Sequence, residues 1–187
     1  LDGSHQRQVK EVLCNSIPGL PAGNQTQDTW LEAGLNQPFT IITGGPGTGK
    51  TLVLAKLVYL FVHLNRRLSV GRVTKPQVMV CAATQGALNV IVDCLQQLGS
   101  SCPRLARVYL AGDAVSAACR QLAVYANHAR LLSVPSMLQT TEVVLLTCQT
   151  AGLRHVRDNL NIKQVLIDTA NAVSEMESLT PLVHTAP

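Results

Sequence analysis

The feature that most constrains this chain is a glycine-rich turn, GGPGTGKT at residues 44–51, placed between a β-branched run and a long apolar segment. The turn satisfies the pattern GxxxxGK[ST], and we expect a strand over residues 39–43 before it and a buried helix over residues 51–65 after it. Glycines let successive backbone N–H groups surround an anion without Cβ clashes, and the positive end of the following helix points at the same place. The turn therefore predicts a site for a nucleoside triphosphate.

Each residue of this loop has an expected part in nucleotide binding. Backbone N–H groups form the cradle, Lys50 reaches the β- and γ-phosphates, and the Thr51 hydroxyl coordinates Mg²⁺, an ion that prefers oxygen ligands. The expected nucleotide-binding set is Gly45, Pro46, Gly47, Thr48, Gly49, Lys50 and Thr51. The loop by itself selects no reaction, because small-molecule kinases carry the same motif.

The composition is that of a folded chain with an aliphatic core. Hydrophobic residues make up 47% of the sequence and charged residues 14%, which excludes a disordered chain. The formal charge of +4 permits a polyanionic partner without identifying one. The cysteines form no CxxC pair, so we expect reduced thiols in an intracellular protein, cytoplasmic or nuclear, rather than a zinc site. The longest apolar run, residues 52–64, is too short to span a membrane, so no membrane partner is expected.

Apolar runs of strand length alternate with helical patterns along the chain. This order predicts an α/β fold, a three-layer P-loop NTPase with a mainly parallel sheet flanked by helices, in a single domain over residues 1–187. Besides residues 39–43, we expect strands at residues 77–82, 107–110, 142–147 and 164–167, and besides residues 51–65 we expect helices at residues 4–14, 86–98 and 111–132. Residues 15–38 are expected to form a loop insertion, and residues from about 100 to 140 a variable helical insertion.

Four further segments occur in a recognisable order. They read LDGSHQRQV at residues 1–9, VCAATQGALN at 80–89, VLLTCQTAG at 144–152 and VLIDTANAVSEMESLTPL at 165–182. With the nucleotide loop, they resemble the first RecA-like domain of superfamily 1B helicases, the group that includes the RNA helicase of nonsense-mediated decay and the zinc-finger helicases. The resemblance covers almost the whole chain. It implies a RecA-like fold, ATP and Mg²⁺ as ligands, single-stranded RNA or DNA as a partner, and a longer parent chain that supplies a second RecA-like domain or other domains.

The opening segment, residues 1–9, is similar to the adenine-reading motif of this family, LNxxQxxAV. His5 occupies the position of the usual glutamine, and Gln6 takes that part only if the register shifts by one residue. The resemblance thus implies Gln6 as a nucleotide contact.

Two other segments resemble motifs that touch single-stranded nucleic acid. Residues 80–89 are similar to motif Ia, VCAPSNxAVD, which implies contacts from Thr84 and Gln85. Residues 144–152 are similar to motif Ic, which implies a contact from Thr147. Both segments lie beyond strand ends, where ligands of open α/β sheets gather, although ordinary βα loops would look the same.

Residues 165–182 resemble motif II of the family, VLIDEAxQxxExExLxPL. The resemblance implies that Asp168 holds Mg²⁺ opposite Thr51, so that Lys50 and Asp168 are the implied catalytic residues. Thr169, however, replaces the glutamate that activates water, and Ala172 replaces the glutamine that senses the γ-phosphate. A threonine hydroxyl is no base near neutral pH, and loss of a general base costs about 10²- to 10⁴-fold, so we expect slow or absent hydrolysis.

Two functions stay open at this point. The chain is either the Mg·ATP-binding motor domain of a superfamily 1B RNA or DNA helicase with impaired hydrolysis, or a catalytically inactive ATP-binding interaction module within a larger protein. A small-molecule P-loop kinase accounts for neither motif Ia nor motif II.

Overall fold

A computed structural model describes residues 17–69, 75–110, 113, 115–126 and 135–184. The helices are α2 (Gln25–Asn36), α3 (Lys50–Leu68), α4 (Gln85–Gln96), α5 (Pro135–Thr140), α6 (Cys148–Ala151), α7 (Arg154–Arg157) and α8 (Glu175–Leu179). The strands are β1 (Gln77–Ala82), β2 (Leu105–Leu110), β3 (Ala123–Ala126), β4 (Val143–Thr147) and β5 (Ile162–Ile167). Short 3₁₀ turns occur at Gly99–Ser101, Ala117–Leu122, Ala170–Ala172 and Thr180–His184.

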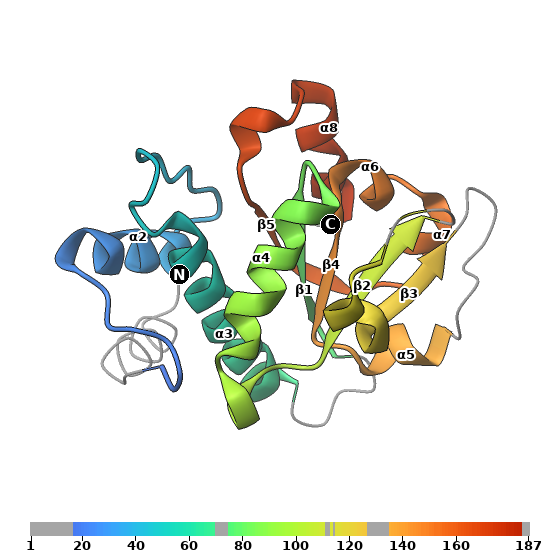
Figure 1. The fold of residues 1–187 in the computed structure, drawn as a ribbon, viewed down its shortest axis with the longest axis horizontal. Helices are drawn as coiled ribbons and strands as arrows, with labels where there is room; N and C mark the ends of the chain where they lie inside the picture. Colours follow the sequence, from blue (N-terminus) through green and yellow to red (C-terminus); the bar gives the residue numbers. More distant parts are fainter. Residues whose placement is uncertain (1–16, 70–74, 111–112, 114, 127–134, 185–187) are drawn as a thin grey trace.

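The strands form one sheet in the order β3-β2-β4-β1-β5, and each neighbouring pair is parallel. In the centre, Val80 of β1 lies opposite Leu145 of β4 on one side and Leu166 of β5 on the other. Every residue of β1 is buried, because helices cover both faces of the sheet (Figure 1). The predicted α/β fold with a parallel sheet between helices is therefore confirmed.

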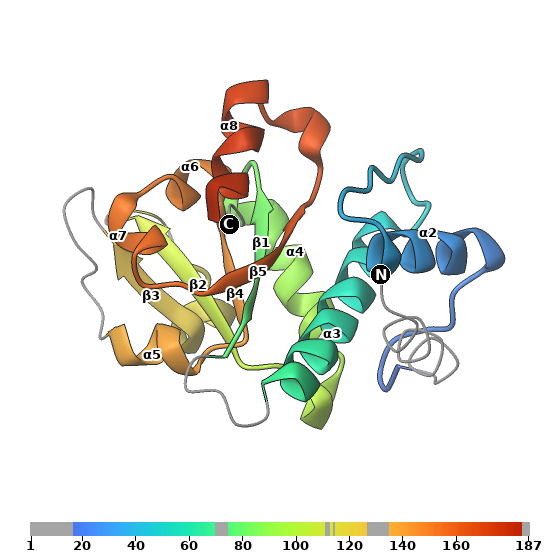
Figure 2. The ribbon, with the colours of Figure 1, turned by 180° about the vertical axis from the view of Figure 1, so that it is seen from behind.

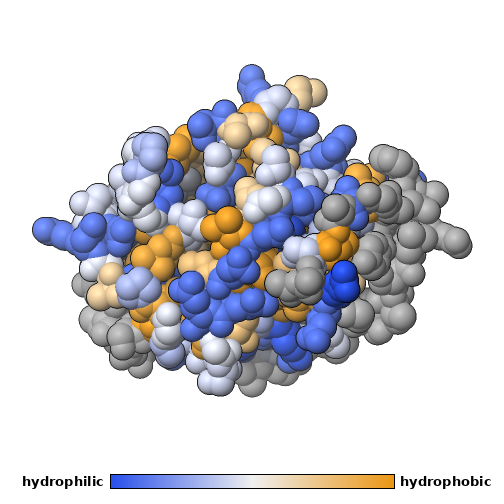
Figure 3. All heavy atoms as spheres, viewed as in Figure 1, coloured by the Kyte–Doolittle hydropathy of each residue, from blue (hydrophilic) through white to orange (hydrophobic). Residues whose placement is uncertain are grey.

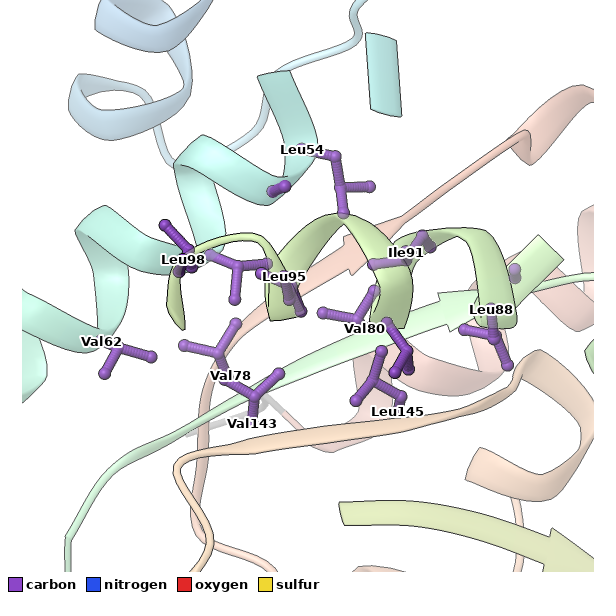
Figure 4. Packing of buried hydrophobic residues seen from close by; sticks show 14 of the residues in the cluster. Leu54, Val62, Val78, Val80, Leu88, Ile91, Leu95, Leu98, Val143 and Leu145 are labelled. Atoms are coloured by element: carbon purple, nitrogen blue, oxygen red, sulfur yellow. The ribbon is translucent and has the colours of Figure 1, made fainter. Parts of the chain in front are cut away.

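One core lies between the sheet and the layer formed by α3 and α4. Leu88, Ile91 and Leu95, spaced along one side of α4, face the valine and leucine side chains of β1 and β4 (Figure 4). Full burial of each such side chain stabilises the fold by roughly 1.5–3 kcal/mol. Seen from outside, this layer is mostly polar, with small separate apolar spots (Figure 3). The packing sets the position of the first turn of α4 beyond the end of β1.

A second core lies on the opposite face of the sheet. There Leu138 of α5, Ala151 of α6 and Val156 of α7 pack against Met79 and Val144 of the central strands. Figure 2 shows this side of the molecule, with the ends of β1, β4 and β5 at the top of the view. The two cores together hold the carboxyl ends of these three strands at one edge.

The expected strand at residues 39–43 is wrong, because this segment runs as irregular chain. Phe39 is 67% exposed and Ile41 is 72% exposed, so neither packs into a core. A strand forms only where a neighbour accepts and donates its backbone hydrogen bonds. In the described sheet, β5 is the edge strand next to α3 and pairs with β1. Residues 39–43 share no ladder with it, and their β-propensity is not enough by itself.

The expected loop insertion at residues 15–38 is also wrong over residues 25–36, which form α2. Asn24 and Gln27 make a reciprocal capping box that starts this helix. Gln27, Leu31 and Leu35 are buried at a spacing of four residues, and the two leucines pack against α3. Residues 25–36 are mostly polar and bury only a narrow apolar stripe, so their composition did not indicate a helix.

The expected helical insertion between about 100 and 140 contains two strands of the sheet instead. β2 pairs with β4 and β3 pairs with β2, with Val108 opposite Val124 in the second pair. The expected helix at residues 111–132 is wrong in its described part, because residues 117–122 form a 3₁₀ turn and residues 123–126 form β3, which pairs with β2. The other expected strands and helices are confirmed with small shifts of their bounds, except the helix at residues 4–14, which lies outside the described residues.

Two expectations from composition bear on the described chain. Within the described ranges, no helix is long and apolar enough to cross a membrane. Of the cysteines in the described ranges, Cys81, Cys94, Cys102, Cys119 and Cys148 are free thiols.

Candidate functional site

The glycine-rich loop is shaped for an anion. Gly47 and Gly49 have φ angles of +72° and +83°, a region that L side chains rarely adopt. Gly49 is the N-cap of α3 and offers no side chain, so an outside acceptor can reach the first N–H groups of this helix. A Cβ built on Gly45 or Gly47 would meet nothing within 4 Å, which leaves open space around the loop. The loop therefore fits the phosphates that its sequence predicts.

Lys50 lies over its own loop. Its ammonium group donates hydrogen bonds to the carbonyl oxygens of Gly44 and Gly45, at 2.8 and 2.7 Å. The Thr48 hydroxyl donates to the same Gly45 oxygen at 2.9 Å. These contacts hold a positive charge beside the open loop, where an entering phosphate would exchange weak carbonyl partners for charge-assisted bonds.

Helix α2 supports the same loop from outside through Gln27, a contact that sequence reasoning missed. The Gln27 amide nitrogen donates to the Thr48 carbonyl oxygen at 3.0 Å, and Gln27 is almost fully buried. A Cβ on Gly49 would come within 2.5 Å of that nitrogen, so the close approach, besides the φ angle, requires glycine there. The sequence signal that could have indicated this helix is the capping box of Asn24 and Gln27. Gln6, the predicted nucleotide contact, lies outside the described residues.

Trp30 also faces the loop. Its ring atom Cη2 lies 3.5 Å from the position of a Cβ built on Gly44. It is the sole tryptophan of these 187 residues and lies beside the loop, so its fluorescence is sensitive to changes there.

Asp168 lies at the carboxyl end of β5, where its backbone N–H donates to the Cys81 carbonyl at 2.8 Å. Asn65, near the end of α3, exchanges hydrogen bonds of 2.8 and 3.3 Å with Gln164 near the start of β5. From that tie, α3 extends about 22 Å back to Lys50, whereas β5 extends about 13 Å to Asp168. The hydrogen bonds between Asn65 and Gln164 thus place the last part of α3 beside the first part of β5.

The residue after Asp168 has an unusual backbone. Thr169 has φ +52° and ψ +44°, the left-handed region that β-branched residues avoid. Thr169 and Ala172 are both exposed, and neither side chain carries a carboxylate. Among the described residues, no group of three His, Cys, Asp or Glu side chains could hold a metal ion. Mg²⁺ would therefore rely on nucleotide oxygens and water together with Thr51 and Asp168.

Thr84 and Thr147 start two neighbouring helices at the same edge of the sheet. Ala82, two residues before Thr84, lies opposite Thr147 in the pairing of β1 with β4. The Thr84 hydroxyl accepts the Ala87 N–H and the Thr147 hydroxyl accepts the Thr150 N–H, each at 3.2 Å. The Thr147 hydroxyl also shares a hydrogen bond of 2.8 Å with the Thr150 hydroxyl. Capping uses one acceptor site of the Thr84 hydroxyl and leaves its hydrogen for another partner. Thr84, which is exposed, can donate that hydrogen to a phosphate oxygen.

Gln85, the third predicted nucleic-acid contact, is turned into the protein. Its amide nitrogen donates to Asp113 at 2.9 Å, and its amide oxygen is buried without a hydrogen bond among the described residues. A contact between Gln85 and nucleic acid would require this side chain to leave Asp113.

At the opposite edge of the sheet, an ion-pair cluster is structural. Arg66 donates two hydrogen bonds to the Glu142 carboxylate, at 2.7 and 2.9 Å, and the Arg104 N–H donates a third at 3.0 Å. Burial raises the pKa of Glu142, but these bonds and the two arginine charges outweigh it, so the net pKa is lowered. Arg66 thereby ties α3 to the start of β4 and is committed to this contact.

These features together define a RecA-like P-loop domain: five parallel strands, a glycine-rich loop at the start of a buried helix, and an aspartate at the end of β5. The family model described as an AAA domain (AAA_11) matches residues 22–133, more than half of the chain. The chain belongs to this family, and together with its relatives the match identifies a RecA-like domain of superfamily 1B helicases.

Curated relatives agree with this assignment. The chain is 28% identical over 200 residues to the ATP-dependent helicase upf1 of Schizosaccharomyces pombe, covering 90% of this chain and 21% of that protein. It is 28% identical over 200 residues to the ATP-dependent helicase NAM7 of Saccharomyces cerevisiae, covering 91% and 20%. It is 22% identical over 247 residues to the 3'-5' exoribonuclease HELZ2 of Mus musculus, covering 96% and 8%. The chain spans about a fifth of the length of the first two relatives.

Proposed function

We propose that this chain is the Mg·ATP-binding motor domain of a helicase that acts on single-stranded RNA, with hydrolysis impaired by Thr169. The observation that carries the proposal is the glycine loop at the start of α3, with open space around Gly45 and Gly47 and the Lys50 ammonium group held on the loop carbonyls. RNA is preferred to DNA because similar proteins are named as regulators of nonsense transcripts and as an exoribonuclease. The second RecA-like domain, and a place in the cytoplasm or nucleus, are part of this proposal for the longer parent.

Each residue of the loop has a defined part in this proposal. The N–H groups of Gly45 to Thr51 surround the β- and γ-phosphates, and Lys50 moves its ammonium group from the loop carbonyls to a phosphate oxygen. Thr51 and Asp168 would hold Mg²⁺, which neutralises phosphate charge when bound. Gln27 keeps Thr48 in place, while Gln6 stays the proposed contact to adenine.

At the neighbouring strand ends, Thr84 and Thr147 contact the nucleic-acid backbone. Both hydroxyls lie at helix starts, where N–H groups and small polar side chains favour phosphate without reading sequence. Gln85 joins them if its amide is released from Asp113. Contacts of this kind suit a domain that moves along a strand.

Turnover separates this function from the second candidate, an inactive ATP-binding interaction module. The specific observation in favour of the second candidate is that Thr169 and Ala172, both exposed beyond β5, supply no base for water. The experiment measures RNA-stimulated ATP hydrolysis by the parent protein with wild-type, Lys50→Ala and Thr169→Glu sequences.

Turnover that Lys50→Ala abolishes supports the motor domain and removes the inactive module. Mg·ATP binding without turnover, partly restored by Thr169→Glu, supports the module. Binding is followed separately by calorimetry. If folded protein shows no affinity for Mg·ATP, both candidates fail.

A further inference from the structure

Arg107, in the middle of β2, is a fully buried arginine next to the proposed nucleic-acid edge. Its Nη2 donates to the Gln85 carbonyl oxygen at 3.0 Å and to the Asn89 side-chain oxygen at 2.9 Å. Gln85 and Asn89 belong to the first turns of α4, the helix that Thr84 caps. One guanidinium therefore joins strand β2 to the start of this helix.

Among the described residues, the charge on Arg107 has no carboxylate partner of the kind that buried arginines normally have. Its Nε and Nη1 atoms are buried and make no hydrogen bond within the described part of the chain. No carboxylate of the described residues forms an ion pair with it, and the Tyr109 ring lies 4.9 Å from its central carbon. Buried charges are usually paired, because removing them from water is costly. The neutral Asn89 stands where an acid would cancel this charge.

The surrounding hydrogen bonds form a closed network around the start of α4. Gln85 accepts from Arg107 through its carbonyl and donates through its amide to Asp113 at 2.9 Å. The same Asp113 oxygen accepts the Leu110 N–H at the end of β2, also at 2.9 Å. The network thus begins and ends on β2, at Arg107 and Leu110, and between them it holds the backbone of Gln85, the residue after Thr84.

We infer that Arg107 is a positioning residue for nucleic-acid binding, and that its uncancelled charge contributes to the attraction of phosphate at the start of α4. The inference rests on the proposed function, because it concerns the same edge. A charge-assisted bond to the Gln85 carbonyl orients the first turn of α4 and with it Thr84. The positive charge adds to the positive end of the helix dipole, which favours anions. The Asp113 carboxylate, which accepts the Gln85 amide N–H, offsets part of this attraction but does not pair with the guanidinium directly.

The first test compares Arg107→Met, Arg107→Lys and, as a matched control, Arg120→Met, which removes an exposed arginine charge outside the network. The affinity for a fluorescein-labelled oligouridylate is measured by anisotropy, and the affinity for Mg·ATP by Trp30 fluorescence. We expect Arg107→Met to weaken RNA binding at least tenfold with Mg·ATP affinity unchanged within twofold. Arg107→Lys should be intermediate, because an ammonium keeps the charge but loses the planar fork. Arg120→Met should stay within twofold of wild type.

The second test is Asn89→Asp, which supplies the missing carboxylate and keeps the side-chain size. We expect a higher urea midpoint, because the buried guanidinium gains a partner, together with two- to fivefold weaker RNA binding and a shallower salt dependence. A purely structural role would raise the midpoint and leave RNA binding unchanged. This variant also decides the case if Arg107→Met fails to fold.

The outcomes keep the two proposals apart. If wild-type protein binds Mg·ATP but no RNA, the proposed function fails. If wild-type protein binds RNA, and either folded Arg107→Met or Asn89→Asp binds it as tightly, the inference about Arg107 is overturned while the function stands.

Discussion

Thr169 offers the sharpest test of the local geometry at the end of β5. Its φ of +52° places an L, β-branched residue in the left-handed region, and its exposed side chain makes no capping hydrogen bond. That backbone costs an L-residue roughly 1–2 kcal/mol. Glycine relieves this cost but increases the entropy of the unfolded chain, which takes back about 0.4–1 kcal/mol. Thr169→Gly should therefore leave the free energy of unfolding unchanged or raise it by up to about 1.5 kcal/mol.

The measurement is urea denaturation followed by far-UV circular dichroism, with the midpoint compared at equal m-value. Gln37→Gly is the matched control, since Gln37 is exposed and has an ordinary φ of −103°. The control gains the same unfolded-state entropy without relief of strain, so its stability should fall by about 0.4–1 kcal/mol. If Thr169→Gly loses as much stability as Gln37→Gly, the backbone at Thr169 is unstrained and the reasoning is refuted.

Three further variants test other contacts. Glu142→Gln should cost about 1–3 kcal/mol at pH 7, because Arg66 loses a charged partner. The lowered pKa of Glu142 means that its contribution is complete above pH 4.5 and is lost as the pH falls below it, so urea midpoints of the variant and wild type should converge in acid. Burial lowers the pKa of His184, so wild-type stability should fall as the pH drops below 6.5, and His184→Gln should flatten that fall in the same assay. Gln27→Ala should weaken Mg·ATP binding by about 2- to 10-fold in Trp30 fluorescence titrations, with exposed Gln25→Ala unchanged; equal affinities would exclude Gln27 as a support of the loop.

Much of the fold was predictable because its signals are local. The strand at residues 77–82 and the helix that begins near Gln85 show their apolar spacing directly in the sequence, and the structure confirms both. The segment at residues 39–43 has the same β-branched character, yet it forms no strand because no neighbouring strand pairs with it. β-Propensity shows that a segment can adopt an extended conformation, but a strand forms only where a neighbouring strand is available to pair with it.

The amino-acid sequence by itself identified the glycine-rich loop, because its glycines, lysine and threonine occur at a fixed spacing within eight consecutive residues. Only the tertiary structure decided which distant side chains support it. The Gln27 amide bonds to the Thr48 carbonyl 21 residues further along the chain. Arg107 bonds to Asn89 because the order of strands in the sheet brings β2 near the start of α4. Such contacts join residues far apart along the chain. They form, and contribute to stability, only when packing of the core has brought the two elements together.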